Sequence, residues 1–301
     1  MSVTLRDRVA VVTGAGGGLG RAHAILLAQR GAKVVVNDLP GKDGQPSQAD
    51  TVVDEIRAAG GQAVSALGSV SEPAAAKSII DQAIDSFGRI DILVNNAGLL
   101  RDRSFIKMDL ADFEAVVKVH LFGSAYCTHA AWPHMVEQKH GRVIVTTSVA
   151  GTNGNFGQAN YAAAKMGLIG LANALSLEGK RNNVLVNAIS PGAQTAMTEG
   201  LNPDFMVPLL KPELISALVA YLSSDECDVT GEVLWAAAGG YARMHYIETQ
   251  GIQLDPREDV TPESIADNID RIRDLTDPIP VVPGSFGRFA ERLGSIGLWE
   301  G

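Results

Sequence analysis

Short runs of β-branched and aliphatic residues alternate with longer helical segments over most of the chain. The runs are nearly continuous in Val, Ile and Leu, as in VAVV, VVV and VIV. A strand of this composition has both faces covered, which is typical of parallel strands joined by crossover helices. We therefore predict an α/β fold with a doubly wound parallel sheet of seven strands flanked by helices. The expected strands are Arg8–Thr13, Lys33–Asp38, Gln62–Leu67, Asp91–Asn95, Arg142–Thr147, Val184–Ile189 and Glu232–Ala236.

Helical segments fill the intervals between these strands. Two of them are long and apolar on more than one face, which predicts a homodimer or homotetramer interface. The composition shifts beyond Arg243, so we expect a core of residues 1–244 and an extension of residues 245–301 that packs on the core or on a partner subunit. The extension is expected to carry one charged helix, Thr261–Asp274. The core helices are expected at Arg21–Arg30, Ala49–Ala59, Glu72–Phe87, Leu110–Glu137, Ala159–Lys180 and Pro212–Ser223.

Composition excludes several classes of function. The chain has 34 acidic and 25 basic residues, a net charge of −9, which repels polyphosphate and disfavours a nucleic-acid partner. No apolar stretch is long enough for a membrane span and no leader segment is evident, so we expect a cytoplasmic protein. Cys127 and Cys227 lack the spacing of a metal site or a disulfide framework, and are expected to be buried free thiols. No metal is expected.

The first expected strand continues into a glycine-rich turn and a helix, in the segment VAVVTGAGGGLGRA. Glycines such as Gly14, Gly18 and Gly20 are needed where a backbone turns tightly and approaches a pyrophosphate at a helix N-terminus. Such a turn can also be a flexible loop, but Asp38 lies 24 residues after Gly14 at the end of the second strand. We therefore predict a Rossmann-type dinucleotide site. Asp38 should bind the adenosine ribose hydroxyls and repel a 2′-phosphate, which favours NAD over NADP.

A Tyr, a Lys and a Ser form the candidate catalytic group. Tyr161 and Lys165 are four residues apart in an expected helix, and Ser148 closes the fifth strand at the ligand-binding edge. Lowering a phenol pKa from about 10 to about 7 needs about 4 kcal/mol, which one ammonium about 4 Å away supplies at an effective dielectric of 20. Tyr161 could then exchange the proton of a substrate hydroxyl while Ser148 donates to its oxygen. Alternatively, Tyr161 is a half-buried interface aromatic and Lys165 an exposed charge.

Several motifs occur together in one order along residues 13–192: TGAGGGLG, NNAG at Asn95–Gly98, Ser148, YAAAK and SPG at Ser190–Gly192. Together they resemble the short-chain dehydrogenase/reductase superfamily. The longer segments NNAGLLRDRSF, VHLFGSAY and NFGQANYAAAKMGLIGLANALSLEGK are similar to the 3-hydroxyacyl-CoA dehydrogenase units of type 2 peroxisomal multifunctional enzymes. The resemblance implies NAD-dependent oxidation of (3R)-hydroxyacyl-CoA thioesters, including steroid side-chain esters, in a lipid β-oxidation pathway.

The resemblance also implies roles for individual residues. His120 stands where many members of the superfamily have an asparagine that holds a proton-relay water, so it is either a catalytic relay or a hydrogen-bonded structural residue. Gly68 or Ser69 replaces an acid that commonly meets the adenine amino group. The implied catalytic group is Ser148, Tyr161, Lys165 and His120. The implied cofactor contacts are Gly14, Gly18, Leu19, Gly20, Asp38, Ser69, Val70, Asn95, Ala97, Gly98, Tyr161, Lys165, Pro191 and Gly192.

Three functions remain open from the sequence. The first is a 3-hydroxyacyl-CoA dehydrogenase, in which Arg101, Arg103 and Lys107 face the CoA phosphates; the same residues could instead be a solvated cluster with Asp102 in a salt bridge. The second is a 17β-type hydroxysteroid dehydrogenase. The third is a non-catalytic dinucleotide sensor, against which the intact Ser, Tyr and Lys argue. Neither GxSxG nor a P-loop motif occurs, which excludes those hydrolase and NTPase sites.

Overall fold

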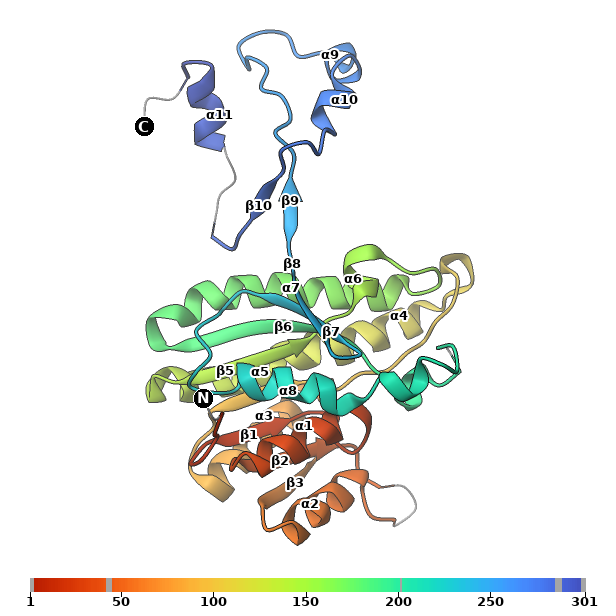
Figure 1. Ribbon diagram of the computed structural model, residues 1–301, viewed down its shortest axis with the longest axis vertical. Coiled ribbons are helices and arrows are strands. Elements are labelled where there is room, and N and C mark those ends of the chain that lie inside the picture. Colours follow the sequence, from red (N-terminus) through yellow and green to blue (C-terminus); the bar gives the residue numbers. More distant parts are fainter. Residues whose placement is uncertain (1–2, 42–44, 201, 285–288, 299–301) are drawn as a thin grey trace. The chain divides into compact units, whose positions relative to one another are not determined.

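The computed structural model describes residues 3–41, 45–200, 202–284 and 289–298. Within them one sheet has eight strands in the order β3-β2-β1-β4-β5-β6-β7-β8 (Figure 1). The predicted α/β doubly wound architecture is confirmed, and each of the seven expected strands is present. The strands are β1 Val9–Val12, β2 Lys33–Asp38, β3 Gln62–Leu67, β4 Ile92–Asn95, β5 Gly141–Thr146, β6 Val184–Gly192, β7 Val233–Ala237 and β8 Gly240–Met244.

The eighth strand is the one that the sequence prediction missed, so the expected count of seven is wrong by one. Two residues join β7 to β8, and both have positive φ, 48° at Ala238 and 81° at Gly239. This is the pattern of a tight hairpin turn whose twist matches its strands. Because β8 (GYARM) is mostly exposed and lacks a run of apolar residues, it carries no strand signal of its own.

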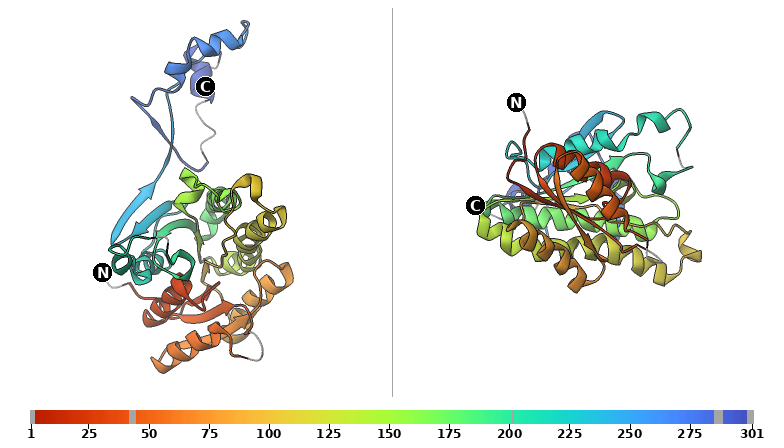
Figure 2. Two further views of the ribbon diagram at one scale, coloured as in Figure 1. Left: turned by 90° about the vertical axis from the view of Figure 1, so that its right-hand side faces the viewer. Right: turned by 90° about the horizontal axis from the view of Figure 1, so that it is seen from below.

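Strands β1 to β7 pair in parallel, and helices cover both faces of the sheet. Val11 lies between Val35 of β2 and Leu93 of β4, and all three side chains are fully buried. Helix α1 packs against α8 in one layer, while α3 packs against α5 and α4 against α7 in the other (Figure 2). The sheet helices are α1 Gly18–Gln29, α2 Gln48–Ala58, α3 Pro73–Phe87, α4 Leu110–Val117, α5 Gly123–Gln138, α6 Val149–Asn153, α7 Ala159–Gly179 and α8 Pro212–Leu222.

The expected continuous helix Leu110–Glu137 is interrupted. Between α4 and α5 the chain forms the π-helical turn η2, Lys118–Phe122, which widens the hydrogen-bond spacing for five residues. The turn buries His120. Helical periodicity gives no sign of such a turn, because the apolar pattern continues through it.

Residues Met244–Gly301 form a second compact unit, and Met1–Arg243 the first. In the second unit β9 (Tyr246–Glu248) pairs with β10 (Ile279–Val281) in antiparallel fashion, and Arg292 of α11 (Phe289–Ser295) forms an ion pair with Glu248. The expected single helix Thr261–Asp274 is wrong, since it is divided into α9 (Pro262–Ala266) and α10 (Ile269–Ile272). That this extension packs on the core or on a partner subunit stays a prediction.

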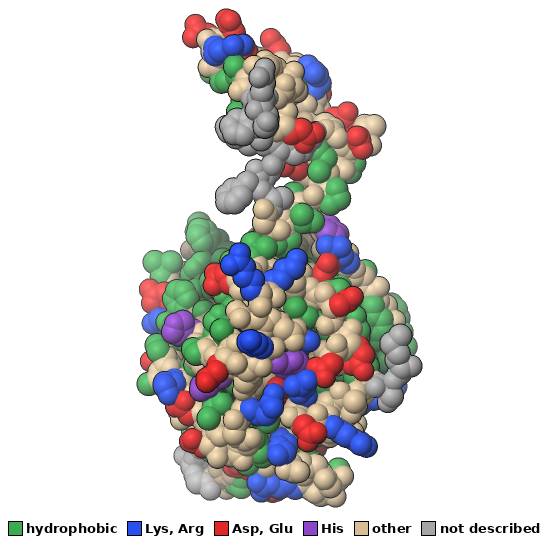
Figure 3. Space-filling model, turned by 90° about the vertical axis from the view of Figure 1, so that its left-hand side faces the viewer, with side chains coloured by type: hydrophobic (Ala, Val, Ile, Leu, Met, Phe, Trp, Pro, Cys, Tyr) green, Lys and Arg blue, Asp and Glu red, His purple; other side chains and the backbone are tan. Residues whose placement is uncertain are grey.

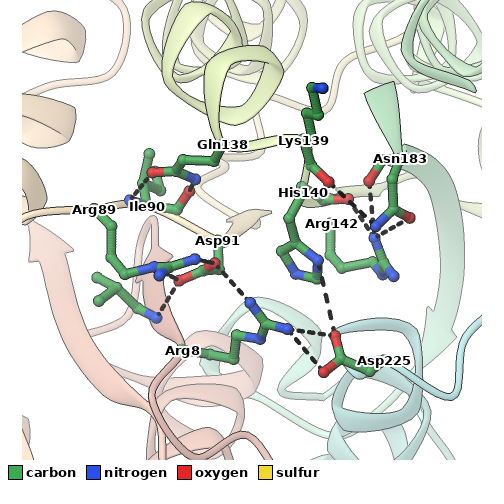
Figure 4. A network of polar contacts seen from close by, with 12 residues as sticks. Arg8, Arg89, Ile90, Asp91, Gln138, Lys139, His140, Arg142, Asn183 and Asp225 are labelled. Atoms are coloured by element: carbon green, nitrogen blue, oxygen red, sulfur yellow. Dashed lines mark hydrogen bonds and ion pairs between the residues drawn. The ribbon is translucent and has the colours of Figure 1, made fainter. Parts of the chain in front are cut away.

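The amino-terminal edge of the parallel sheet carries a network of paired charges (Figure 4). Asp91, which precedes β4, is fully buried and accepts from Arg89 (2.6 and 2.8 Å), Arg8 (3.2 Å) and the amide of Val9 (2.9 Å). Arg8 also binds both carboxylate oxygens of Asp225 at 2.8 Å. The network therefore connects β1, β4 and the loop after α8.

Side chains of both charge signs lie interspersed over the face shown in Figure 3, without a broad patch of one sign there. Cys127 and Cys227 are buried free thiols, as predicted. Among the described residues no helix is both long enough and apolar enough to cross a membrane.

Candidate active site

The glycine-rich turn after β1 is held against the end of β4. Thr13 Oγ1 accepts hydrogen bonds from the amides of Asn96 (3.0 Å) and Ala97 (3.1 Å). Gly14 has a φ of 60°, and a Cβ there would lie 2.7 Å from the Cα of Ala97. Position 14 therefore requires glycine both for its backbone conformation and for the close approach of the two strand ends.

Asp38 lies at the end of β2, against the same turn. Its Oδ2 accepts from the amide of Gly16 (2.8 Å) and its Oδ1 from the amide of Leu39 (2.7 Å). A Cβ at Gly16 would lie 2.6 Å from Oδ2, so only glycine lets the carboxylate reach the turn. A bare backbone beside an acid at this edge fits the diphosphate and ribose of a dinucleotide.

A pocket of about 580 Å³ opens at the carboxyl ends of the parallel strands. It brings together the glycine-rich turn, Asp38 and the predicted Tyr and Lys. The predicted residues that line it are Gly14, Gly18, Leu19, Asp38, Gly98, His120, Tyr161, Lys165, Pro191 and Gly192. The lining also includes residues that were not predicted as site residues from the sequence, among them Asn96, Thr195, Met197, Met206, Leu210 and Ala237.

Other predicted cofactor contacts lie away from the lining of this pocket. Asn95 is buried and donates to Thr128 Oγ1 of α5 (3.0 Å), so it joins β4 to a helix. A Cβ at Gly20 would lie 2.3 Å from the carbonyl oxygen of Gly14, which makes this glycine a packing requirement behind the turn. Ala97, Ser69 and Val70 also lie outside the lining. Their part in cofactor binding stays a prediction.

The catalytic candidates come from the end of β5 and from α7. Thr147 Oγ1 donates to the carbonyl of Lys165 (2.7 Å), which fixes α7 against the strand end. Lys165 Nζ donates to the carbonyl of Thr146 and lies 5.3 Å from the ring centroid of Tyr161. Lys165 is only 2% exposed, so the alternative of an exposed lysine is wrong. Ser148 caps α6, accepting from the amide of Ala150 (3.1 Å), and hydrogen-bonds the Tyr161 phenol.

Burial governs the protonation of this pair. It raises the pKa of the Tyr161 phenol, while the hydrogen bond with Ser148 lowers it. Burial also lowers the pKa of the Lys165 ammonium, from 10.5 to about 7. The expected lowering of the phenol pKa by Lys165 is therefore not found in this structure, because both groups lose hydration when charged. The structure does bring the phenol, the amine and the Ser148 hydroxyl to one place.

His120 contacts Tyr161, and the two rings meet edge to face with centroids 5.1 Å apart. Its Nε2 contacts the backbone of Leu99, 3.1 Å from the amide and 2.8 Å from the carbonyl oxygen. Burial and then the charge of Lys165 lower its pKa to about 3, so the ring is neutral. Its Nδ1 has no hydrogen-bond partner within the described part of the chain. The structural and the relay role both fit this placement.

The residues of the RDR segment, Arg101–Arg103, differ in which of the two interpretations they fit, a CoA-facing group or a solvated charge cluster. Arg101 forms an ion pair with Asp112 of α4 (3.5 Å) and is about half exposed. Asp102 accepts a hydrogen bond from the side-chain amide of Gln158 (2.7 Å), so its contact is with an amide and is not the salt bridge that the sequence suggested. Arg103 and Lys107 are exposed.

The chain is similar to known proteins in sequence and in structure. The family described as short chain dehydrogenase matches residues 8–205. The chain is 52% identical over 275 residues to the peroxisomal multifunctional enzyme type 2 of Drosophila melanogaster, covering 89% of this chain and 46% of that protein. It is 46% identical to a short-chain type dehydrogenase/reductase of Mycobacterium tuberculosis, covering 91% of this chain and 95% of the relative.

Two solved structures are similar over nearly the whole chain. Full-length peroxisomal multifunctional enzyme type 2 from Drosophila melanogaster has a TM-score of 0.81 at 45% identity, covering 97% of this chain and 49% of that one. A short chain dehydrogenase from Mycobacterium avium has a TM-score of 0.81 at 40% identity, covering 94% and 100%. The chain thus spans less than half the length of the fly enzyme in each comparison. The resemblance inferred from the motifs is confirmed.

Proposed function

Because the chain belongs to the short-chain dehydrogenase family, a family of NAD(P)-dependent oxidoreductases, we propose that it oxidises 3-hydroxyacyl-CoA thioesters to 3-ketoacyl-CoA with NAD. The observation that carries the proposal is the joint lining of one pocket by the glycine-rich turn, Asp38, Tyr161 and Lys165. A dinucleotide held by the first two would meet a proton-transfer group formed by the others.

The dinucleotide fits the residues at its proposed site. The turn offers backbone without side chains at Gly16 and Gly18, and Asp38 presents a carboxylate already held by two amides. Its negative charge would disfavour the 2′-phosphate of NADP, which supports NAD. When bound, NAD would supply the hydride acceptor, and its cationic ring would favour the phenolate form of Tyr161.

Tyr161, Ser148 and Lys165 have different roles in the proton transfer. Tyr161 takes the proton of the substrate hydroxyl as hydride leaves the carbon that carries this hydroxyl. Ser148 donates a hydrogen bond to the oxygen that becomes the carbonyl. Lys165, with a pKa of about 7, is partly protonated at neutral pH and stabilises the phenolate when it carries its charge. Its bond to the Thr146 carbonyl keeps the amine beneath the ring of Tyr161.

The acyl-CoA part of the proposal rests on relatives. The names of two further relatives refer to thioester chemistry. One is a (2S)-[(R)-hydroxy(phenyl)methyl]succinyl-CoA dehydrogenase subunit of Thauera aromatica (37% identical), and the other is a 3-oxoacyl-[acyl-carrier-protein] reductase of Synechocystis (42% identical). Arg101, Arg103 and Lys107 place cations after β4 on a chain that is acidic as a whole. We assign them to the CoA phosphates.

A substrate panel tests the proposal. The enzyme is mixed with NAD and with (3R)-hydroxyacyl-CoA, (3S)-hydroxyacyl-CoA or a free 17β-hydroxysteroid, and NADH absorbance is followed. Turnover of a CoA ester supports the proposal, whereas turnover of the steroid alone selects the hydroxysteroid dehydrogenase. Tyr161→Phe should abolish NADH production and leave NAD affinity nearly unchanged. Binding of NAD without any turnover would favour the dinucleotide sensor.

A double variant tests the CoA assignment. Replacing Arg101 and Arg103 with Ala should raise KM for the CoA ester about tenfold, since each cation contributes a charge-assisted contact to a phosphate. KM for a CoA-free hydroxysteroid, if one is oxidised, or for a short pantetheine thioester should not change. Equal effects on both kinds of substrate would remove the assignment.

A homodimer or homotetramer is also proposed. A hollow of about 400 Å³ lies between α5 and α7 and is lined mainly by apolar groups, including Tyr126, Trp132, Leu171 and Leu175. Such an uncovered apolar surface supports contact with a second copy of the chain. Sedimentation of a monomer would contradict it. The cytoplasmic location stays a prediction, and several relatives are named as peroxisomal enzymes.

A further inference from the structure

The segment after β4 lies against the residues that begin α7 through three successive contacts. Consecutive residues on one segment thus meet neighbouring residues on the other. The contacts are Asn160 Nδ2 to the carbonyl of Arg101 (3.0 Å), Gln158 Nε2 to Asp102 Oδ2 (2.7 Å) and the amide of Arg103 to the carbonyl of Gly157 (2.8 Å). Tyr161 follows directly in this helical turn.

Gln158 is the central residue of the contact. It precedes α7 at the N-cap position and is only 8% exposed. Its Oε1 accepts from Asn155 Nδ2 (3.0 Å), while its Nε2 donates to Asp102. The amide can make both bonds in only one orientation, because one end must accept and the other must donate.

Asn160 connects the contact to the backbone of Tyr161. It is fully buried, and its Oδ1 accepts from the amide of Tyr161 (2.8 Å). That amide lies in the first turn of the helix, where it has no helical acceptor of its own. The same side chain that binds Arg101 therefore also caps the residue that carries the phenol.

We propose that Asp102, Gln158 and Asn160 form a clamp that positions the Tyr161 phenol and places one negative charge near it. The inference rests on the proposed dehydrogenase function. Asp102 and Gln158 are positioning residues, since they act through the first turn of α7. A phenol displaced by about 1 Å would lose much of its rate advantage in proton transfer.

The charge of Asp102 acts on the phenol in the opposite sense to the hydrogen bond of Ser148. Among the described residues, Lys165 on the same helix and the neutral His120 of η2 contact the Tyr161 ring. Asp102 after β4 is exposed and contacts Gln158, and its charge acts on the phenol from there. Burial raises the pKa of Tyr161 first of all, the Ser148 hydrogen bond lowers it, and the carboxylate of Asp102 raises it further. Asp102 thus favours the protonated phenol, which shifts the working range of the oxidation to higher pH.

Two variants separate the charge from the contact. Asp102→Asn removes the charge and can still accept from Gln158, so the pKa of Tyr161 should fall by about half a unit. The acidic limb of the pH profile of kcat should move to lower pH by the same amount. Gln158→Leu keeps the charge and removes the contact, so kcat should fall about tenfold with little change in NAD affinity. Glu114→Gln, at an exposed acid of α4, is the control for net charge.

A titration of the phenol without turnover keeps this test independent of the substrate. Tyrosinate absorbance of each protein is compared with that of the matching Tyr161→Phe variant, which isolates the single phenol. If no hydroxyacyl-CoA is oxidised but the phenol titrates lower in Asp102→Asn, the clamp stands and the proposed function fails. The clamp is refuted if Asp102→Asn leaves the titration of a folded protein unchanged. A wild-type kcat in Gln158→Leu would refute it equally.

Discussion

At the amino-terminal edge of the sheet, Asp91 is fully buried and receives four hydrogen bonds, three of them from two guanidinium groups. At the carboxyl edge, Lys165 is almost as buried but donates to a backbone carbonyl. The same layer of strands therefore buries charge in two ways. One edge neutralises it within the protein, and the other leaves it without an acidic partner among the described residues.

The difference in charge pairing between the two edges separates residues that stabilise the fold from residues that are proposed to act in catalysis. Asp91 forms ion pairs with Arg89 and Arg8, and this neighbouring carboxylate raises the pKa of Arg89. Buried groups that have no acidic partner among the described residues, such as Lys165 and His120, have strongly lowered pKa values, about 7 and about 3. Perturbed groups of this kind gather at functional sites. The meeting of two such groups, Lys165 and His120, beside Tyr161 supports the proposal that catalysis takes place at the carboxyl edge.

Replacing the buried amine gives the largest expected effect on function. Lys165→Met should lower kcat at least a thousandfold, which is about 4 kcal/mol of transition-state stabilisation. The free energy of unfolding should change by less than about 1 kcal/mol or increase, because burying the ammonium disfavours folding. Steady-state kinetics and urea unfolding measure the two effects. Lys77→Met, at an exposed lysine, is the control, and an unfolded Lys165→Met protein would contradict the comparison.

Replacing the buried acid at the other edge should do the reverse. Asp91→Asn leaves the charges of Arg8 and Arg89 without compensation and should reduce the free energy of unfolding by about 3 kcal/mol. NAD affinity and kcat per folded molecule should remain within about twofold. Asp81→Asn, which breaks the exposed pair with Lys77, should change the free energy of unfolding by less than about 0.5 kcal/mol. Equal losses in both variants would mean that burial does not decide the strength of these pairs.

Much of the fold could be predicted because its signals are local. The continuous apolar runs of β1, β2 and β4 and the Tyr161 to Lys165 spacing are each contained in a few residues. The hairpin turn at Ala238 and Gly239 was missed, because alanine rarely adopts a positive φ and β8 has no apolar pattern. The π-helical turn η2 was missed for a similar reason.

The missing parts of the site depend on contacts between distant residues. Gln158 and Asp102 are 56 positions apart, and no spacing rule connects an amide to an acid at that separation. Thr195, Met206 and Leu210 line the pocket from the segment after β6, whose sequence has neither strand nor helix periodicity. Asn95 and Asn96 differ by one position, but only the second lines the pocket. Alternation of facing along a strand end decides this, and the motif NNAG alone does not.

Low pH should destabilise the protein, because its buried histidines resist protonation in the folded state. Ser216 Oγ donates to the carbonyl of Pro212 (3.2 Å), so the Nδ1 of His23 donates to Ser216 Oγ (2.8 Å). Burial lowers the pKa of His23 from 6.5 to about 3, so as pH falls the unfolded chain binds a proton before the folded one. The contribution of neutral His23 to the free energy of unfolding is therefore complete above pH 6.5 and is lost as the pH falls below it, by about 2.5 kcal/mol at pH 4.5.

The histidine prediction is checked by urea unfolding at pH 7.5 and pH 4.5. His23→Gln should lose less stability between these pH values than the wild type, while the exposed-site variant His129→Gln should lose as much as the wild type. His120 and His140 also have lowered pKa values, about 3 and about 4, and add destabilisation of the same sign. The comparison weakens if His23→Gln and the wild type lose equal stability.

Asp38 combines features of the two edges. Backbone amides hold its carboxylate by hydrogen bonds, as at the amino-terminal edge, and it also lines the pocket at the carboxyl edge. Asp38→Asn retains an oxygen for the amide of Gly16 and removes the charge, so the fold should be unaffected. The variant should bind NAD about tenfold more weakly, a loss of about 1.4 kcal/mol, because the bonds to the ribose hydroxyls lose their charge. NADP affinity should not fall, since the repulsion of the 2′-phosphate is removed. Fluorescence titration with both dinucleotides measures the ratio, and Asp54→Asn on the exposed face of α2 is the control. A parallel loss for NAD and NADP would show that Asp38 only supports the glycine-rich turn and does not select the cofactor.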